Sequence, residues 1–129
     1  MNPRLAEAAL GLVGTPYRLH GRDAKTGLDC VGLVAEALRR AGYPATAPQG
    51  YTLRNLSFRH WLPFAERNGF RAVDAGGDIA LAMVNPIQPH LLIAVEGGFV
   101  HAHAGLRRVA LMPGPLPWHI PLQWRIAPN

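Results

Sequence analysis

The chain has little cysteine, few acidic residues and no long apolar run, and each of these shortages limits the structures or partners that it can have. A single cysteine among 129 residues excludes an internal disulfide, so Cys30 is either a packed apolar residue or a chemically useful thiol. No apolar run approaches the roughly 20 residues that a membrane-spanning helix needs. The N-terminal segment lacks the apolar core and cleavage site of a secretory signal, which predicts synthesis in the cytoplasm. We expect one domain over residues 1–129, because this length can bury a core without disulfides.

Acidic residues are outnumbered by basic ones. Eight aspartates and glutamates stand against 13 lysines and arginines, which gives a formal net charge of +5. This balance favours anionic partners, among them an anionic cell wall. The arginines are scattered singly or in pairs, with no basic run and no aromatic motif between them. The sequence therefore predicts no nucleic-acid partner.

Helical patterning dominates the first half of the chain. Apolar spacing predicts a first helix over residues 3–14. A glycine-containing loop follows, and then a second helix is expected over residues 30–41, with Asp29 as its N-cap. Residues 53–69 are expected to be mostly helical, although Pro63 must begin or bend a segment.

Short β-prone runs, separated by glycine or proline, make up the second half. They are residues 79–84, 90–96, 99–104 and 107–112, with a last strand expected at 122–127. Helices first and a meander of strands second indicate an α+β fold. In it the N-terminal helices pack on one face of a C-terminal antiparallel sheet.

Cys30 is expected in the first turn of the second helix. Unpaired backbone N–H groups and the helix dipole at this end stabilise a thiolate, and a histidine partner lowers the thiol pKa further toward neutrality. The same N–H groups could hold the oxyanion of an attacked carbonyl. The alternative is a purely structural thiol, because free cysteine is among the most buried residue types.

Three histidines in the predicted sheet are candidates for a base and for the group that orients it. Side chains alternate along a strand, so His101 and His103 share a face. If residues 95–98 form the hairpin loop, His90 lies opposite His103 and two residues along from His101. Either could then orient His90, and the pattern does not choose between them. A zinc site is a further alternative, but no carboxylate of suitable spacing lies nearby.

Three segments resemble the NlpC/P60 superfamily of papain-like cysteine peptidases, which cut peptide bonds in bacterial cell-wall stem peptides. GTPYRLHGRDAKTGLDCVGLV (14–34) is similar to the family's G-x-P-Y, glycine loop and D-C-S-G-[FL]-V. GD at 77–78 stands just before a strand, and HLLIAVEGGFVHA (90–102) is similar to H-V-G-I-Y-x-G-x-x-x-x-H-A. The resemblance covers residues 5–42 and 77–104, and it implies the papain-like NlpC/P60 fold.

The resemblance also implies roles for five residues. Cys30 would be the nucleophile, His90 the general base and His101 the polar third member that orients it. Tyr17 would direct its hydroxyl into the site, where it assists the oxyanion or contacts substrate. Asp29 would help to bind the free amine of a stem peptide, although an N-cap is a structural reason for the same residue.

Two departures from the family pattern affect the substrate side of the site. Val31 stands where the family usually has a serine, which removes a hydroxyl next to the cysteine. The segment RLHGRD replaces a paired-glycine loop and introduces His20 and Arg22, either of which could reshape the pocket.

The function implied by the resemblance is that of a cysteine endopeptidase, a peptidoglycan hydrolase that needs no cofactor and no metal. The family's usual bond joins D-glutamate, through its γ-carboxyl, to the diamino acid, so peptidoglycan stem peptides would be the substrate. The short basic form is similar to stand-alone peptidases of phage tails and gene-transfer particles, whose proteins would be further partners. Two alternatives stay open: a CHAP-like amidase, and a catalytically weak structural or binding module of such a particle or of a wall complex.

Overall fold

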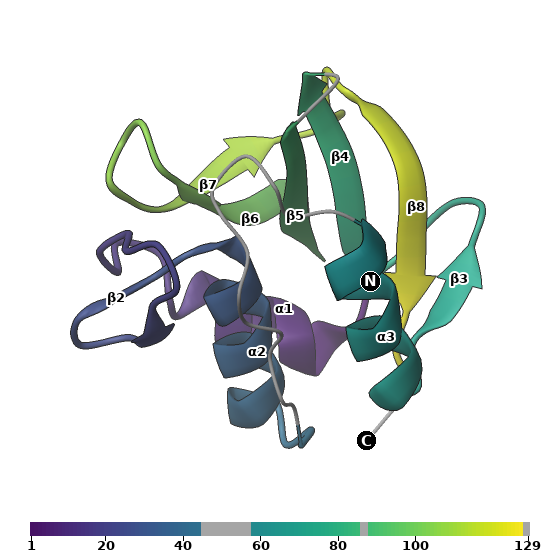
Figure 1. Ribbon diagram of the computed structural model, residues 1–129, viewed down its shortest axis with the longest axis horizontal. Coiled ribbons are helices and arrows are strands. Elements are labelled where there is room, and N and C mark those ends of the chain that lie inside the picture. The colour runs from purple at the N-terminus through teal and green to yellow at the C-terminus, as the bar shows by residue number, and fades with distance from the viewer. Residues whose placement is uncertain (45–57, 86–87, 128–129) are drawn as a thin grey trace.

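A six-stranded antiparallel sheet with helices packed against it forms the body of the computed structural model, which describes residues 1–44, 58–85 and 88–127 (Figure 1). The helices are α1 (Pro3–Leu10), α2 (Cys30–Arg40) and α3 (Phe58–Arg67). In sheet order the strands are β3 (Arg71–Val73), β8 (His119–Arg125), β4 (Ile79–Asn85), β5 (Gln88–Val95), β6 (Gly98–His103) and β7 (Arg108–Pro113). Strands β1 (Arg22–Asp23) and β2 (Gly27–Leu28) pair separately in the loop before α2. No helix within these residues has the length and apolar character needed to cross a membrane.

The α+β fold expected from the sequence is confirmed, with several different boundaries. The first helix ends at Leu10 rather than near residue 14, because the next four residues form turns instead of a further helical turn. The last strand begins at His119 rather than at 122, since the chain after the proline-rich corner already pairs with β4. Helix α3 covers Phe58–Arg67, and the expected helical residues 53–57 lie outside the described part.

Helices α1 and α2 lie together beneath β5 and β6, as Figure 1 shows. Apolar residues of α2 recur at intervals of three or four, as at Val31, Val34 and Leu38, and they are buried in the core. The buried core between these elements contains Leu5, Ala9, Val31, Val34, Leu38, Leu91, Ile93 and Val100. This packing places the N-terminal end of α2 beside the start of β5, which carries His90.

Gly32 lets α2 approach the loop that precedes it. A Cβ atom at this position would lie 2.0 Å from the carbonyl oxygen of Gly21, a backbone atom that no side-chain rotation can move aside. We therefore expect Gly32→Ala to lower the free energy of unfolding by about 3 kcal/mol, measured by urea denaturation. Gly11→Ala is the matched control, because its Cβ would meet nothing closer than 3.5 Å and its φ is −66°. A Gly32→Ala protein as stable as the Gly11→Ala protein would contradict this close approach.

Gly77 and Asp78, the GD pair that resembles the family pattern, have a structural role. The backbone N–H of Gly77 donates to Oε1 of Gln123, and a Cβ at Gly77 would lie 3.0 Å from backbone atoms of Trp124. The buried carboxylate of Asp78 accepts the backbone N–H of Ile126 over 2.8 Å. The pair therefore attaches the C-terminal strand to the sheet and lies outside the cavity that contains Cys30.

Candidate active site

Cys30 is the first residue of α2, as the capping pattern predicts. The Asp29 side chain caps the helix by accepting the backbone N–H of Gly32 at Oδ1 over 2.8 Å. Its other oxygen, Oδ2, accepts the backbone N–H of His20 over 2.7 Å. Cys30 is half-buried, and it packs against the core on one side while lining a cavity on the other.

The hairpin of β5 and β6 has the register that brings the histidines together. Ala94 pairs with Phe99, so the expected register is confirmed. The loop itself is shorter than expected, because Val95 also pairs with Gly98 and only residues 96–97 form the turn. Nε2 of His90 and Nδ1 of His101 lie 2.9 Å apart, within hydrogen-bonding distance, and the two rings meet edge to face at 81°. His101 is only 4% exposed, so its ring is held in place by its surroundings.

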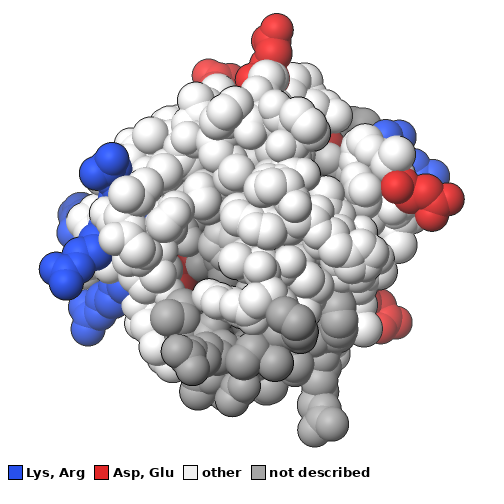
Figure 2. Space-filling view, turned by 90° about the horizontal axis from the view of Figure 1, so that it is seen from above, with Lys and Arg blue, Asp and Glu red and all other residues white. Residues whose placement is uncertain are grey.

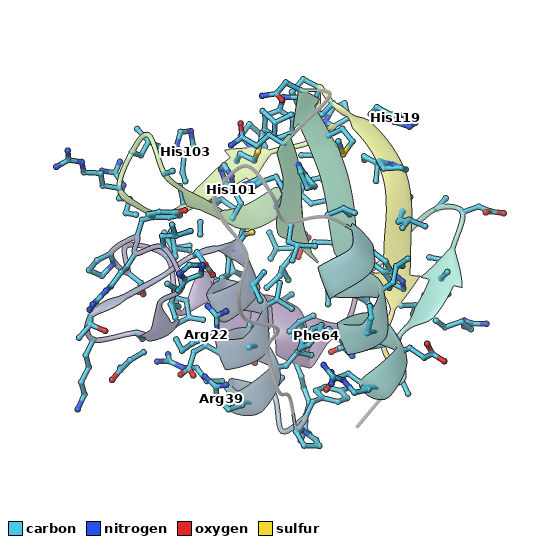
Figure 3. All side chains as sticks on the ribbon, viewed as in Figure 1. Arg22, Arg39, Phe64, His101, His103 and His119 are labelled. Atoms are coloured by element: carbon cyan, nitrogen blue, oxygen red, sulfur yellow. The ribbon has the colours of Figure 1, made fainter. Side chains whose placement is uncertain are left out.

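His103 has a different partner. Its Nδ1 accepts the backbone N–H of Leu106 over 3.0 Å, which fixes the turn after β6. Its ring centroid lies 5.2 Å from that of His101, and Figure 3 shows both side chains on β6, above the start of α2 in that view. Of the two histidines that the pattern leaves open, His101 is the one that contacts His90.

A cavity of about 150 Å³ brings all five expected site residues together. Tyr17, Asp29, Cys30, His90 and His101 line it, although they come from a loop, a helix start and two strands. Its apolar lining includes Leu19, Val84, Pro89, Ala102 and Trp118. The sequence therefore identifies most of the polar lining of this cavity but not Gln88, and most of the apolar wall depends on tertiary packing.

Trp118 is a cavity residue that the sequence analysis did not assign. It precedes β8, and its ring lies edge to face on His90, with 6.5 Å between centroids. The pairing of Met83 with His119 brings the start of β8 beside β4 and so places the indole there. Only the tryptophan-containing, proline-rich corner before the last strand could have indicated this role.

The pKa of the Cys30 thiol is raised to about 12, which contradicts the expectation of a lowered value. Burial is the main cause, and the carboxylate of Asp29 adds to it. Backbone N–H groups of Leu91 and Val31 and the charge of Arg22 act in the opposite direction but are outweighed. Because Leu91 directly follows His90, its hydrogen bond also shows that the sulfur lies against the start of β5. Cys30 is therefore a neutral thiol in the resting protein.

Both histidines of the hydrogen-bonded pair are neutral as well. Burial lowers the pKa of His90 to about 3, and the charges that His101 and His103 would carry lower it further. The pKa of His101 falls to about 4, again through burial first and then through His103. A neutral imidazole has a free lone pair that can accept a proton, which is the form that a general base must have before the reaction.

Tyr17 remains protonated beside the thiol. Burial raises the pKa of its hydroxyl above the usual range, and negative charge on Cys30 or Asp29 would raise it further. The phenol is therefore a hydrogen-bond donor in the cavity. The backbone N–H of Tyr17 donates to the carbonyl of Arg107 over 2.9 Å, which holds this loop against the turn before β7.

Val31 does not face the cavity. Its side chain is 0% exposed and belongs to the core between α2 and the sheet. At the position where the family usually has a serine, this chain therefore has a core side chain. Other residues form the substrate side of Cys30.

Within the described residues, no group of three or more histidine, cysteine, aspartate or glutamate side chains is placed to hold a metal ion. The three histidines of the sheet form ring contacts and hydrogen bonds instead. The zinc alternative therefore has no ligand set in this part of the chain.

Three solved structures have the same fold as this chain. NlpC1 from Trichomonas vaginalis has a TM-score of 0.64 at 19% identity and covers 97% of this chain and 44% of its own. The NlpC/p60 domain of the peptidoglycan hydrolase SagA gives 0.56 at 21%, covering 86% and 87% of the two chains. A protein similar to lipoproteins of the NLP/P60 family, from Staphylococcus aureus, gives 0.61 at 19%, covering 98% and 41%.

The chain thus spans less than half the length of two of these structures and nearly all of the SagA domain. No family model and no curated protein matches it in sequence. At these identities the likeness establishes the NlpC/P60 fold. The activity must therefore be argued from the site itself.

Proposed function

We propose that this chain is a cysteine peptidase of the NlpC/P60 type that hydrolyses peptide bonds in peptidoglycan stem peptides. One observation carries the proposal: a single cavity holds a thiol at a helix N-terminus and a neutral histidine bonded to a second histidine. This is the nucleophile, base and orienting group that acyl transfer through a thioester needs. The fold shared with the domain of a peptidoglycan hydrolase supports the substrate class.

The reaction begins with the Cys30 thiol and the His90 imidazole both neutral. Nδ1 of His90 takes the thiol proton as Sγ of Cys30 bonds to the carbonyl carbon of the substrate. The oxyanion that forms receives hydrogen bonds from the backbone N–H of Cys30 and the hydroxyl of Tyr17. His90 stays oriented throughout because its Nε2 lies 2.9 Å from Nδ1 of His101. The mechanism uses the tautomers in which Nε2–H of His90 is the donor and Nδ1 of His101 the acceptor.

Collapse of this intermediate breaks the C–N bond, and His90 returns the proton to the leaving amine. A water molecule then attacks the thioester carbonyl while His90 takes one of its protons. The second intermediate releases the carboxylic acid, and the proton held by His90 returns to the sulfur. Atoms and charge balance over the cycle without a cofactor.

Mass spectrometry of purified muropeptides tests this function. Wild-type protein is expected to cut the γ-D-glutamyl bond to the diamino acid, which leaves a free γ-carboxyl and a new amine. Cys30→Ser is expected to give no such products. Release of whole peptides from the glycan would indicate the amidase alternative. Absence of any product with folded wild-type protein would favour the binding module. The link to phage tails or gene-transfer particles stays a prediction.

His101 is the positioning residue for His90, and its variants separate that role from a structural one. We expect His101→Ala to lower kcat/KM by about 100-fold, because Nε2–H of His90 loses its acceptor and the ring can rotate. His101→Asn keeps an acceptor oxygen and should recover at least part of that loss. His103→Ala is the matched control, since its Nδ1 bonds to the Leu106 backbone. Equal losses in the alanine and asparagine variants of His101 would exclude the orienting role.

A further inference from the structure

Asp29 is the one acidic residue among the described residues that line the cavity, and its charge is already compensated. Nη1 of Arg22 donates to Oδ1 of Asp29 over 3.1 Å, and the aspartate is only 2% exposed. Oδ1 also accepts the Gly32 N–H, while Oδ2 accepts the His20 N–H. The carboxylate beside the nucleophile is therefore occupied by one cation and two backbone donors.

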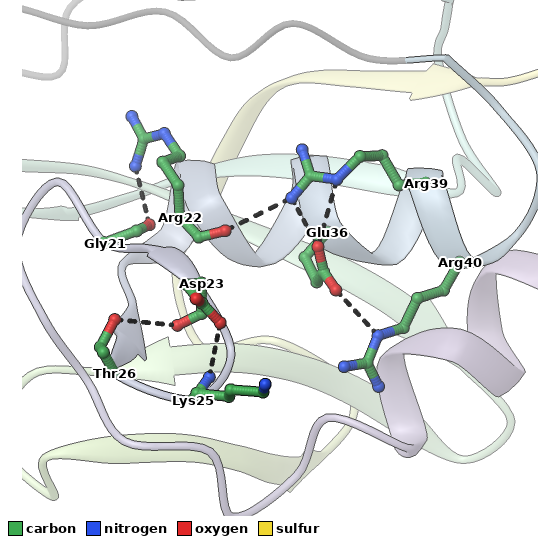
Figure 4. Close-up of polar contacts among 8 residues, drawn as sticks. All are labelled: Gly21, Arg22, Asp23, Lys25, Thr26, Glu36, Arg39 and Arg40. Atoms are coloured by element: carbon green, nitrogen blue, oxygen red, sulfur yellow. Dashed lines mark hydrogen bonds and ion pairs between the residues drawn. The ribbon is translucent and has the colours of Figure 1, made fainter.

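Arg22 is held in this position from both sides. Its Nη1 also donates to the carbonyl of Gly21 over 2.9 Å, as Figure 4 shows. Its own carbonyl accepts Nη2 of Arg39 on α2, whose Nε is bonded to Glu36 over 3.2 Å. The guanidinium thus has hydrogen bonds to Gly21 and Asp29, and the Arg22 backbone is attached to α2.

Three more arginines lie in or next to the two loops that contribute Tyr17, Leu19 and Gly105 to the cavity. Arg18 directly follows Tyr17, and Arg107 and Arg108 are joined to this loop through backbone contacts with Tyr17 and Pro16. All three arginines are exposed, and none forms an ion pair with another described residue. Seen from above in Figure 2, lysine and arginine side chains gather mainly at the left edge of the molecule, with a smaller group at the right. An ammonium group approaching the cavity meets repulsion and finds no uncompensated carboxylate.

We propose that Arg22 determines specificity by pairing with Asp29, so that the site takes acyl-donor peptides whose N-terminus is blocked and disfavours those with a free α-amine. This inference rests on the proposed peptidase function and names its substrate class. A free ammonium near the thiol would be desolvated without a counterion, and this penalty falls on the free-amine peptide alone. Acylated peptides, such as stem peptides still attached to another group at their N-terminus, do not incur it.

Protection of Cys30 from iodoacetamide tests the proposal without requiring turnover. The probes are two synthetic tripeptides, alanyl-γ-D-glutamyl-lysine with its N-terminal amine free or acetylated. With wild-type protein we expect half-protection by the acetylated peptide at about tenfold lower concentration than by the free-amine peptide. In Arg22→Gln, Asp29 regains a net charge, and the two concentrations should become equal or reverse in order. Arg22→Lys keeps the charge and should keep the wild-type preference.

A second readout separates loss of charge from loss of structure. Arg22 lowers the pKa of the Cys30 thiol, so Arg22→Gln should shift the pH profile of alkylation upward in the absence of peptide, while Arg22→Lys should not. Three results would overturn the proposal: equal or better protection by the free-amine peptide in wild type, no protection by either peptide, or an unchanged preference in folded Arg22→Gln. Selective protection without cleavage of either peptide would instead refute the proposed peptidase function alone.

Discussion

His90→Ala is expected to lower kcat/KM for wall peptides by at least about 1,000-fold. With a thiol pKa of about 12, only about one molecule in 10⁵ carries a thiolate at pH 7 unless a base removes the proton during attack. The remaining activity should depend on this rare thiolate. As long as the pH is below the thiol pKa, this remaining activity is therefore expected to increase about tenfold for each unit by which the pH is raised.

Two further variants show whether His90 acts together with Cys30. Cys30→Ser should lose at least as much activity as His90→Ala, and the double variant should be no worse than Cys30→Ser alone, because the two groups perform one step. Urea unfolding of each variant checks that the fold is retained. A His90→Ala protein with more than a tenth of wild-type activity and a flat pH profile would mean that another group is the base.

Local features explain why much of the site could be predicted from the sequence. An aspartate cap is a feature of a few adjacent residues, so the start of α2 and the place of Cys30 were both predicted correctly. The register of the β5–β6 hairpin was predicted correctly as well, because a two-residue turn at 96–97 and the expected four-residue loop at 95–98 both pair Ala94 with Phe99. These two local features already place the thiol at a helix end and the histidines on adjacent strands.

The thiol pKa was predicted with the wrong sign because its main cause is not local. A helix N-terminus stabilises a thiolate, but tertiary packing buries the sulfur, and this burial has the larger effect. The contact of Arg22 with Asp29 depends on how the loop before α2 folds back, and that of Trp118 with His90 depends on β8 pairing with β4. Residue spacing contains no information on such contacts.

Acidification from pH 7 to pH 4 is expected to lower the free energy of unfolding by about 3 kcal/mol through His90 alone. The pKa of His90 is about 3 in the folded protein and about 6.5 when the chain unfolds. Between these values the unfolded state binds a proton that the folded state does not, so stability is lost as the pH falls below 6.5. His101, with its pKa lowered to about 4, changes stability in the same direction.

Urea unfolding at a series of pH values measures this effect, and replacing the histidine isolates it. His90→Gln cannot titrate in this range, so its stability should fall by about 3 kcal/mol less than that of wild type between pH 7 and pH 4. His119→Gln, with an exposed side chain on β8, is the control and should behave as wild type does. If His90→Gln keeps the full wild-type dependence, His90 is not buried as a neutral ring. The general-base mechanism would then lose the uncharged imidazole with which it begins.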